Sequence, residues 1–115
     1  LHFRLFGEKL SMIMHQRSAD FPIGVPSNMI QYTALLLMLA QVTGKQPWKF
    51  IHMFGDAHIY EDQVEQVREL IVREPKRLPT LTLDSTVTDL FAFRPEHFEI
   101  SDYDPHPAMK IPYRP

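Results

Sequence analysis

The stretch from Gln16 to Asn28 reads Gln-Arg-Ser-Ala-Asp-Phe-Pro-Ile-Gly-Val-Pro-Ser-Asn. It holds a cation, a hydroxyl, a carboxylate and a carboxamide close together, and two prolines and a glycine restrict its backbone. A guanidinium can bind a phosphate through two parallel hydrogen bonds, and a carboxamide matches the edge of a pyrimidine. We therefore expect a rigid ligand-binding loop. The alternative is a structural role, with Arg17 and Asp20 as a local ion pair and Asn28 as a helix cap.

The residues on either side of this loop predict an α/β (α+β) fold, with a mixed β-sheet, a long buried helix and a second, outer helix. The long helix should cover 29–43, because its apolar residues run nearly all the way round, with Ser27 or Asn28 as its cap and Gly44 as its end. The outer helix should cover 61–72, where apolar residues follow one face. Strands are expected at 2–6, 10–16, 49–54, 80–83 and 98–100, a short helical turn at 87–90, and an ordered tail or lid at 108–115.

Composition excludes several classes of function. The 115 residues suit one domain, and a net charge of −2 argues against a general nucleic-acid-binding surface. The chain has no cysteine, and its six histidines lack metal-ligand spacing, so we expect neither disulfide nor metal site. The longest apolar run, 34–40, is too short to cross a bilayer. No targeting motif is visible, and a cytoplasmic location is expected.

A second polar group of residues occurs at 55–60, which reads Gly-Asp-Ala-His-Ile-Tyr. His58 and Tyr60 are two residues apart, so on a strand they point to the same face. Such a pair can bind two sugar hydroxyls or one phosphate. The alternative is a core histidine packed beside a core tyrosine.

Together the two groups of residues resemble the thymidylate synthase family, which includes the pyrimidine nucleotide hydroxymethylases. The family's substrate-binding pattern is Gln-Arg-Ser-x-Asp-x-x-Leu-Gly-x-Pro-Phe-Asn, followed by Gly-Asp-x-His-x-Tyr. The chain departs from the first pattern at Ile23 and at Ser27, and the segments 73–75 and 103–107 follow in the family's order, so the resemblance covers nearly the whole chain. The positions that match the first pattern are Gln16, Arg17, Ser18, Asp20, Gly24, Pro26 and Asn28.

The resemblance implies a reaction and a role for each site residue. The reaction is the reductive methylation of dUMP to dTMP, with 5,10-methylenetetrahydrofolate as co-substrate and no metal. Arg17 and Ser18 would bind the phosphate, with Arg17 also near the catalytic thiol, and Asn28 would read O4 and N3 of the base. His58 and Tyr60 would orient the deoxyribose. The adjacent positions complete the two sites: Ala19, Asp20 and Ile59 for the nucleotide, and Asp20, Ile23 and Gly24 for the folate.

The family's nucleophile is the cysteine of a Pro-Cys-His motif, which this chain lacks. By family spacing it would lie a few residues before Leu1, and the chain already begins in a strand pattern. We therefore expect residues 1–115 to be the carboxy-terminal portion of a larger thymidylate synthase-like enzyme. The complete enzyme should be a homodimer built by sheet-on-sheet contact. Alone, this chain should be inactive and bind nucleotide weakly, with Arg17 and Asp20 only assisting catalysis.

Two residues bear on the choice of substrate and product. The resemblance implies that Asn28 favours uracil. The cytidylate hydroxymethylases of the family carry an aspartate at this position, which accepts from the amino group of cytosine. Ser27 stands where the family has a phenylalanine that forms an apolar wall on the folate side. Without that wall the pocket would admit more water, and water competing with hydride would give a hydroxymethyl product. The remaining alternative is a non-catalytic nucleotide-binding or dimerisation module.

Overall fold

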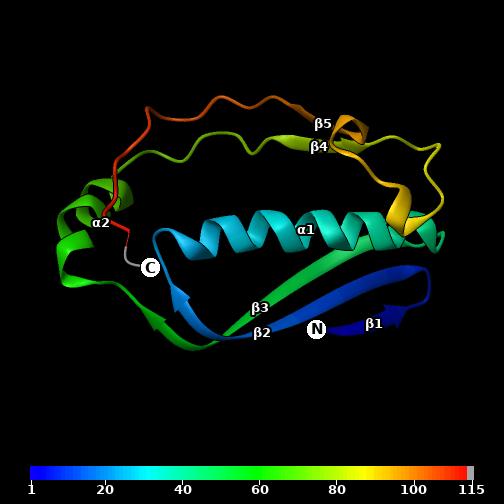
Figure 1. Ribbon diagram of the computed structural model, residues 1–115, viewed down its shortest axis with the longest axis horizontal. Helices are drawn as coiled ribbons and strands as arrows, with labels where there is room; N and C mark the ends of the chain where they lie inside the picture. Colours follow the sequence, from blue (N-terminus) through cyan, green and yellow to red (C-terminus); the bar gives the residue numbers. More distant parts are fainter. Residues whose placement is uncertain (114–115) are drawn as a thin grey trace.

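The central strand of the main sheet is β2 (Lys9–Asp20) in the computed structural model, which describes residues 1–113 (Figure 1). β1 (His2–Phe6) pairs with β2 antiparallel through a turn at Gly7, whose φ of 58° is a left-handed conformation that suits glycine. β3 (Gln46–His58) pairs with the other edge of β2 in parallel. The expected mixed sheet is therefore confirmed.

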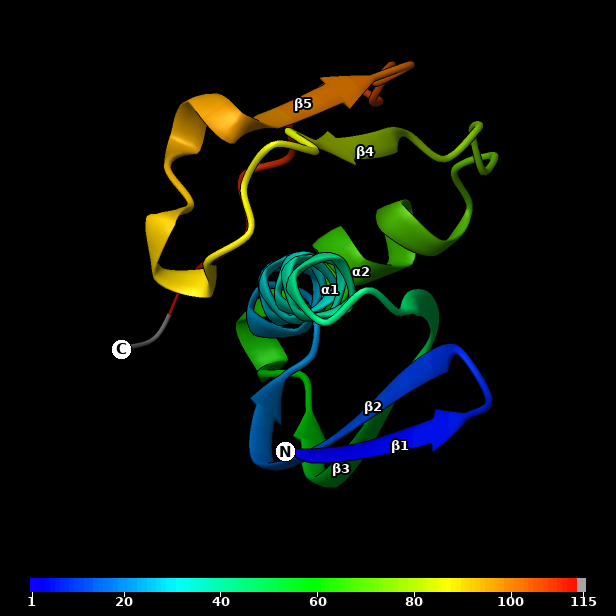
Figure 2. The same ribbon diagram turned by 90° about the vertical axis from the view of Figure 1, so that its right-hand side faces the viewer.

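The long helix α1 (Gly24–Val42) connects β2 to β3 and lies across one face of the sheet (Figure 2). Leu36 and Ala40 of α1 pack on Leu10 and Met12 of β2, and the Met12 side chain has no exposed surface. Burial of these side chains away from water is the main force that holds the helix on the sheet. The amino-terminal part of α1 is more open, and Met29 is 48% exposed, so the helix is less buried than its sequence predicted.

The structure corrects both boundaries of the expected loop at 17–28. β2 continues to Asp20 and α1 begins at Gly24, which leaves a connection of only residues 21–23. Pro26 does not delay the helix, because the backbone N–H groups of the first turn have no acceptor within the helix and a proline there loses no hydrogen bond. The N-cap is Ile23, without a side-chain hydrogen bond, so neither Ser27 nor Asn28 caps α1.

The far end of α1 follows the sequence prediction more closely. The helix ends at Val42, and Gly44 adopts a φ of 64° two residues later, as expected for a glycine that ends a helix. Gln41 donates hydrogen bonds from Nε2 to the backbone oxygens of Asp84 and Val87, both at 2.8 Å. These two bonds join the helix to the third layer of the molecule.

That third layer is a two-stranded antiparallel sheet of β4 (Thr80–Leu83) and β5 (Phe98–Ser101), which lies on the side of α1 opposite the main sheet (Figure 2). Between them, the helical turn occurs at Leu90–Ala92 (η2) rather than at 87–90, because the Asp89 carboxylate accepts from the backbone N–H of Phe91 at 2.9 Å. A second such turn, Pro95–His97 (η3), precedes β5.

The outer helix is confirmed, although its first residues form a 3₁₀ turn, Glu61–Gln63 (η1), before α2 (Val64–Ile71). After β5 the chain runs back along the molecule toward α2 (Figure 1). This return carries the expected tail, of which residues 114–115 lie outside the described part of the chain. Within residues 1–113, no helix combines the length and apolar character that a membrane span requires.

Candidate functional site

The carboxyl ends of β2 and β3 meet at the start of α1, and this brings the two polar groups of residues together. In the parallel register Asp20 lies opposite His58, and the backbone N–H of Phe21 donates to the His58 carbonyl at 2.9 Å. Strand ends of this kind are where α/β folds commonly position ligand groups. The predicted site residues 17–20 are therefore held on a strand, not on the rigid loop that the sequence suggested.

Gly55 allows β3 to approach the backbone of Arg17. A Cβ atom at position 55 would lie 2.8 Å from the Arg17 carbonyl oxygen, closer than real Cβ contacts allow. The glycine of the Gly-Asp-Ala-His-Ile-Tyr segment thus has a structural purpose, since it lets the two strands continue side by side to the site.

A cavity of about 360 Å³ joins two of the predicted residues. It is lined by Arg17 and Asn28, together with Leu1, Met14, His15, Gln16 and Tyr32. It lies where β2 extends beyond β1, whose first strand residue, His2, pairs with Ile13. Arg17 makes no ion pair with Asp20 or any other residue in 1–113, so its guanidinium is available, and the local ion pair considered from the sequence is wrong.

Asn28 is held by a hydrogen-bond network rather than by the helix end. Gln16 donates from Nε2 to the Asn28 Oδ1 at 3.1 Å and to the Ser18 backbone oxygen at 3.0 Å. The Gln16 Oε1 lies 2.8 Å from His52 Nε2. Gln16 matched the family pattern in the sequence, but its bond to a histidine 36 residues later carries no sequence signal.

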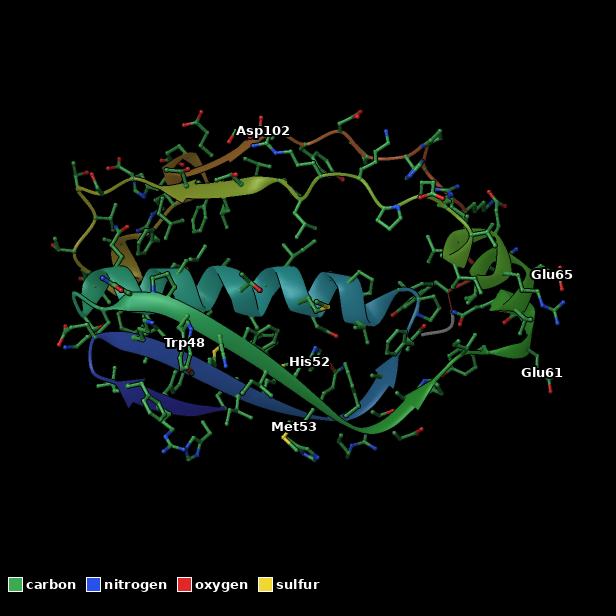
Figure 3. The ribbon with its side chains drawn as sticks, turned by 180° about the vertical axis from the view of Figure 1, so that it is seen from behind. Trp48, His52, Met53, Glu61, Glu65 and Asp102 are labelled. Carbon is green, nitrogen blue, oxygen red and sulfur yellow. The ribbon has the colours of Figure 1, made fainter. Side chains whose placement is uncertain are left out.

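His52 occupies the space between the sheet and α1, toward which its side chain points in Figure 3, whereas Met53 points away. Its ring lies 4.1 Å from that of Phe54 and 5.4 Å from that of Phe50, centroid to centroid. The Nδ1 atom is buried without a hydrogen-bond partner in the described chain. Burial lowers the pKa of His52 below its usual range, because the imidazolium would lose hydration.

Asp20 is tied to Gln63, a residue that the sequence analysis did not select. The Gln63 side chain has no exposed surface, and its Nε2 donates to the Asp20 carboxylate at 3.2 Å and to the Pro112 carbonyl at 2.9 Å. Its Oε1 accepts from the backbone N–H of Tyr60 at 3.0 Å. The only sequence signal was a glutamine three residues after Tyr60, which is also the spacing of a helix-start capping pair. Gln63 therefore joins a proposed folate contact, the sugar segment and the carboxy-terminal tail.

His58 and Tyr60 lie together, although β3 ends at His58 and strand alternation does not place them. Their rings meet edge to face, 5.1 Å between centroids. The His58 Nδ1 lies 3.6 Å from the Asp56 carboxylate, beyond hydrogen-bond distance. Ile59 between them is 45% exposed, and the pair does not line the 360 Å³ cavity that holds Arg17 and Asn28.

The remaining predicted residues surround the β2–α1 connection. Ala19 is 1% exposed, so neither its side chain nor its backbone offers a ligand appreciable surface. Gly24 is close to both neighbouring site residues, since a Cβ atom there would lie 3.7 Å from Asn28 Oδ1 and 3.8 Å from Asp20 Cβ. Ile23 and Gly24 begin α1 beside Asp20, the third residue assigned to the folate. Residues 1–113 contain no group of three or more histidines and carboxylates placed to hold a metal ion.

The fold and the polar strand ends together define an α+β protein whose candidate site lies at the carboxyl ends of two parallel strands. A family model described as Thymidylate synthase matches residues 1–114. The chain belongs to the thymidylate synthase family. Membership gives it a thymidylate synthase-like, methyltransferase-type function in nucleotide biosynthesis, for which the family uses dUMP and methylenetetrahydrofolate.

Proposed function

We propose that residues 1–115 form the carboxy-terminal portion of a thymidylate synthase that converts dUMP to dTMP with methylenetetrahydrofolate. In this proposal Arg17 and Ser18 bind the phosphate, Asn28 reads the base, and His58 and Tyr60 orient the deoxyribose. Asp20, with Ile23 and Gly24, contacts the folate. The observation that carries the proposal is that Arg17, which has no ion pair within residues 1–113, and Asn28, whose carboxamide Gln16 orients, come together where β2 ends and α1 begins.

The orientation of Asn28 supports uracil as the base. Its Oδ1 accepts from Gln16, which leaves its amino group directed away from Gln16. An amino group donates to the O4 carbonyl of uracil, whereas cytosine presents an amino group of its own at that position. The second lone pair of Oδ1 can accept from N3–H of uracil, so the carboxamide matches both groups of that edge.

The nucleophile must come from outside these 115 residues, which contain no cysteine. β1 and β2 pair antiparallel, with His2 opposite Ile13. Residues that continued this pairing before Leu1 would pass along β2 toward Arg17. A thiol a few residues before Leu1 would then lie beside the Arg17 guanidinium, which stabilises a thiolate and lowers the thiol's pKa. Addition of that thiolate to C6 of the pyrimidine makes C5 nucleophilic.

We also propose a homodimer formed by the face of the main sheet that α1 does not cover. Ile51 is 42% exposed and Met53 52% exposed on β3, and Figure 3 draws Met53 on the side away from α1. Ile13 of β2 pairs with Ile51 and lies on the same face. An open apolar sheet face of this kind is typical of a surface that packs against a second copy.

The test is an Asn28→Asp substitution in the complete enzyme, with dissociation constants measured for dUMP and dCMP. A carboxylate accepts from the cytosine amino group and repels the O4 carbonyl, so we expect the preference to move toward dCMP by at least about tenfold. Asn28→Ala is the control, because it should weaken both nucleotides without favouring dCMP. An unchanged preference in Asn28→Asp would contradict the assignment of Asn28 to the base.

A hydroxymethyl product is the second candidate, and the observation behind it is Ser27, exposed in the first turn of α1 next to Asn28. A small hydroxyl here leaves room for water where the family has a phenylalanine. Mass spectrometry of the nucleotide product decides between the two, since hydride transfer gives a methyl group and hydration gives a hydroxymethyl group.

A further inference from the structure

The Gln16 carboxamide makes hydrogen bonds to Ser18, Asn28 and His52, and a backbone oxygen fixes which of its ends is the donor. The Ser18 carbonyl oxygen can only accept, so the end of the Gln16 carboxamide that meets it at 3.0 Å must be the nitrogen. The oxygen of Gln16 must then face His52, 2.8 Å away. Gln16 therefore has a single orientation that satisfies both of its ends.

This orientation also determines the protonation of His52. Because Gln16 presents an oxygen to it, the Nε2 of His52 must carry a proton and donate. In the neutral ring the Nδ1 is then unprotonated, which agrees with a buried Nδ1 that has no partner in the described chain. A backbone carbonyl on β2 thus determines the tautomer of a side chain on β3.

The orientation of Gln16 also fixes that of Asn28, the candidate base-reading residue. The Gln16 amino group has two protons, and the second is directed at Asn28, 3.1 Å away. Asn28 must accept this hydrogen bond with its Oδ1, so its amino group points away from Gln16 and can donate to a ligand. Rotation of the Asn28 amide by 180° would place two amino groups against each other.

We propose that His52 is a positioning residue that sets base specificity: its Nε2–H holds the Gln16 carboxamide, which holds Asn28 with its amino group toward the ligand. This inference rests on the proposed function of Asn28. Without the His52 donor, the Gln16 oxygen loses its partner and only the Ser18 carbonyl and Asn28 still hold the carboxamide. Gln16 is then held less firmly, and Asn28 can more often turn its oxygen toward the ligand. The site would then distinguish less well between a carbonyl and an amino group on the pyrimidine.

The competing role for His52 is packing, because its ring contacts those of Phe50 and Phe54. Two substitutions separate the roles. His52→Phe keeps an aromatic ring and removes the donor, whereas His52→Gln removes the ring and keeps an N–H donor at a similar reach. If His52 acts by positioning Gln16, His52→Gln should keep the base specificity and His52→Phe should lose it. If His52 acts only by packing, His52→Phe should keep the specificity and His52→Gln should lose it.

The first measurement is made on the complete protein without nucleotide. Long-range ¹H–¹⁵N NMR distinguishes the two neutral tautomers, and we expect His52 in the Nε2–H form at neutral pH, changing to the other form or to a mixture in Gln16→Met. An Nδ1–H tautomer in the unsubstituted protein would overturn the proposal. This result is independent of the substrate and so is not affected if the proposed function fails.

The second measurement is the ratio of dissociation constants for dCMP and dUMP. We expect His52→Phe to lower this ratio about tenfold, the effect of one lost hydrogen bond, and His52→Gln to keep it within about threefold of the unsubstituted protein. Equal losses in both variants, or no loss in His52→Phe, would overturn the proposal. If the unsubstituted protein shows no preference for dUMP, the proposed function fails, while the tautomer still decides whether His52 positions Gln16.

A variant from β2 guards against misfolding of the His52 variants. Gln16→Met removes the connection and leaves His52 in place, so it should lower the ratio by the same factor. The double variant Gln16→Met/His52→Phe should show no further decrease, because both residues act through one network. Additive decreases would mean that His52 acts on the site independently of Gln16.

Discussion

Single residues of β3 and η1 determine how the candidate site is held. Gly55 allows the close approach of the two strands, Gln63 joins three segments in the interior, and His52 orients Gln16. None of these three residues would contact the nucleotide in the proposed function. Each affects the site through a neighbour, and each gives a prediction.

Gly55→Ala should destabilise the fold by about 1–3 kcal/mol, the usual cost of overpacking. The reason is the 2.8 Å approach of the added Cβ to the Arg17 carbonyl, which is backbone and cannot rotate away. Urea unfolding measures the change. Gly24→Ala is the matched control, because its Cβ would meet only ordinary contacts at 3.7 Å and beyond. Equal stability of the two variants would contradict this account of Gly55.

Gln63→Leu should lower the free energy of unfolding by about 3 kcal/mol, because it leaves the Asp20 carboxylate and the Pro112 carbonyl without their donor. Loss of protection from amide exchange near the tail should accompany it. Gln31→Leu, at an exposed position on α1, should stay within about 0.5 kcal/mol of the unsubstituted protein. A tolerated Gln63→Leu would mean that the tail is held by other contacts.

His52 also predicts a pH dependence of stability. Its folded-state pKa is lowered by burial, so near and below the ordinary value of about 6.5 the unfolded chain binds more protons than the folded one. The contribution of this residue is therefore fully present above that pH and decreases as the pH falls below it. Urea unfolding between pH 5 and 8 should show a smaller decrease in His52→Gln than in the unsubstituted protein. Identical slopes would show that His52 is not the group responsible.

At the scale of elements, α1 does more than cover the sheet. Its first two turns carry Gly24 and Asn28 to the site, and its last turn carries Gln41 to the 84–87 segment. The sequence predicted the helix and its glycine end, because the apolar pattern and Gly44 are local signals. It did not predict the start, because the tolerance of Pro26 depends on where the first turn falls.

Gln41→Leu should detach the 84–92 segment from α1 without unfolding the helix. Two backbone oxygens lose their donor, so amide exchange in this segment should accelerate about tenfold, while exchange in the middle of α1 remains slow. Hydrogen exchange resolved by residue tests this, with Gln31→Leu again as the control on the same helix. Uniform acceleration along α1 would indicate general destabilisation instead.

At the scale of the molecule, α1 lies between two sheets, but nothing in residues 1–113 covers the outer face of the main sheet (Figure 2). The proposed dimer predicts that Met53→Lys shifts the complete enzyme from dimer to monomer in sedimentation, because it buries a charge in an apolar interface. Ile100→Lys is the control, since Ile100 is 62% exposed but belongs to β5. A Met53→Lys protein that remains dimeric would exclude this face as the interface.

The sequence by itself determined the α+β class, the hairpin at Gly7, the two helices and the family to which the chain belongs. These features depend on local patterns or on motifs at fixed intervals, which need no knowledge of distant contacts. It also identified Arg17 and Asn28, the two predicted residues that line one cavity.

Only the tertiary structure decided that β2 continues through residues 17–20, because that extension requires β3 alongside and a glycine at position 55. It likewise decided the partners of Gln16 and Gln63, which come from segments 36 and 49 residues farther along the chain. A glutamine has the same local preferences whether its carboxamide meets water, a histidine or a carboxylate. Its partner is fixed by the packing of the layers, which brings residues far apart in sequence within hydrogen-bond distance.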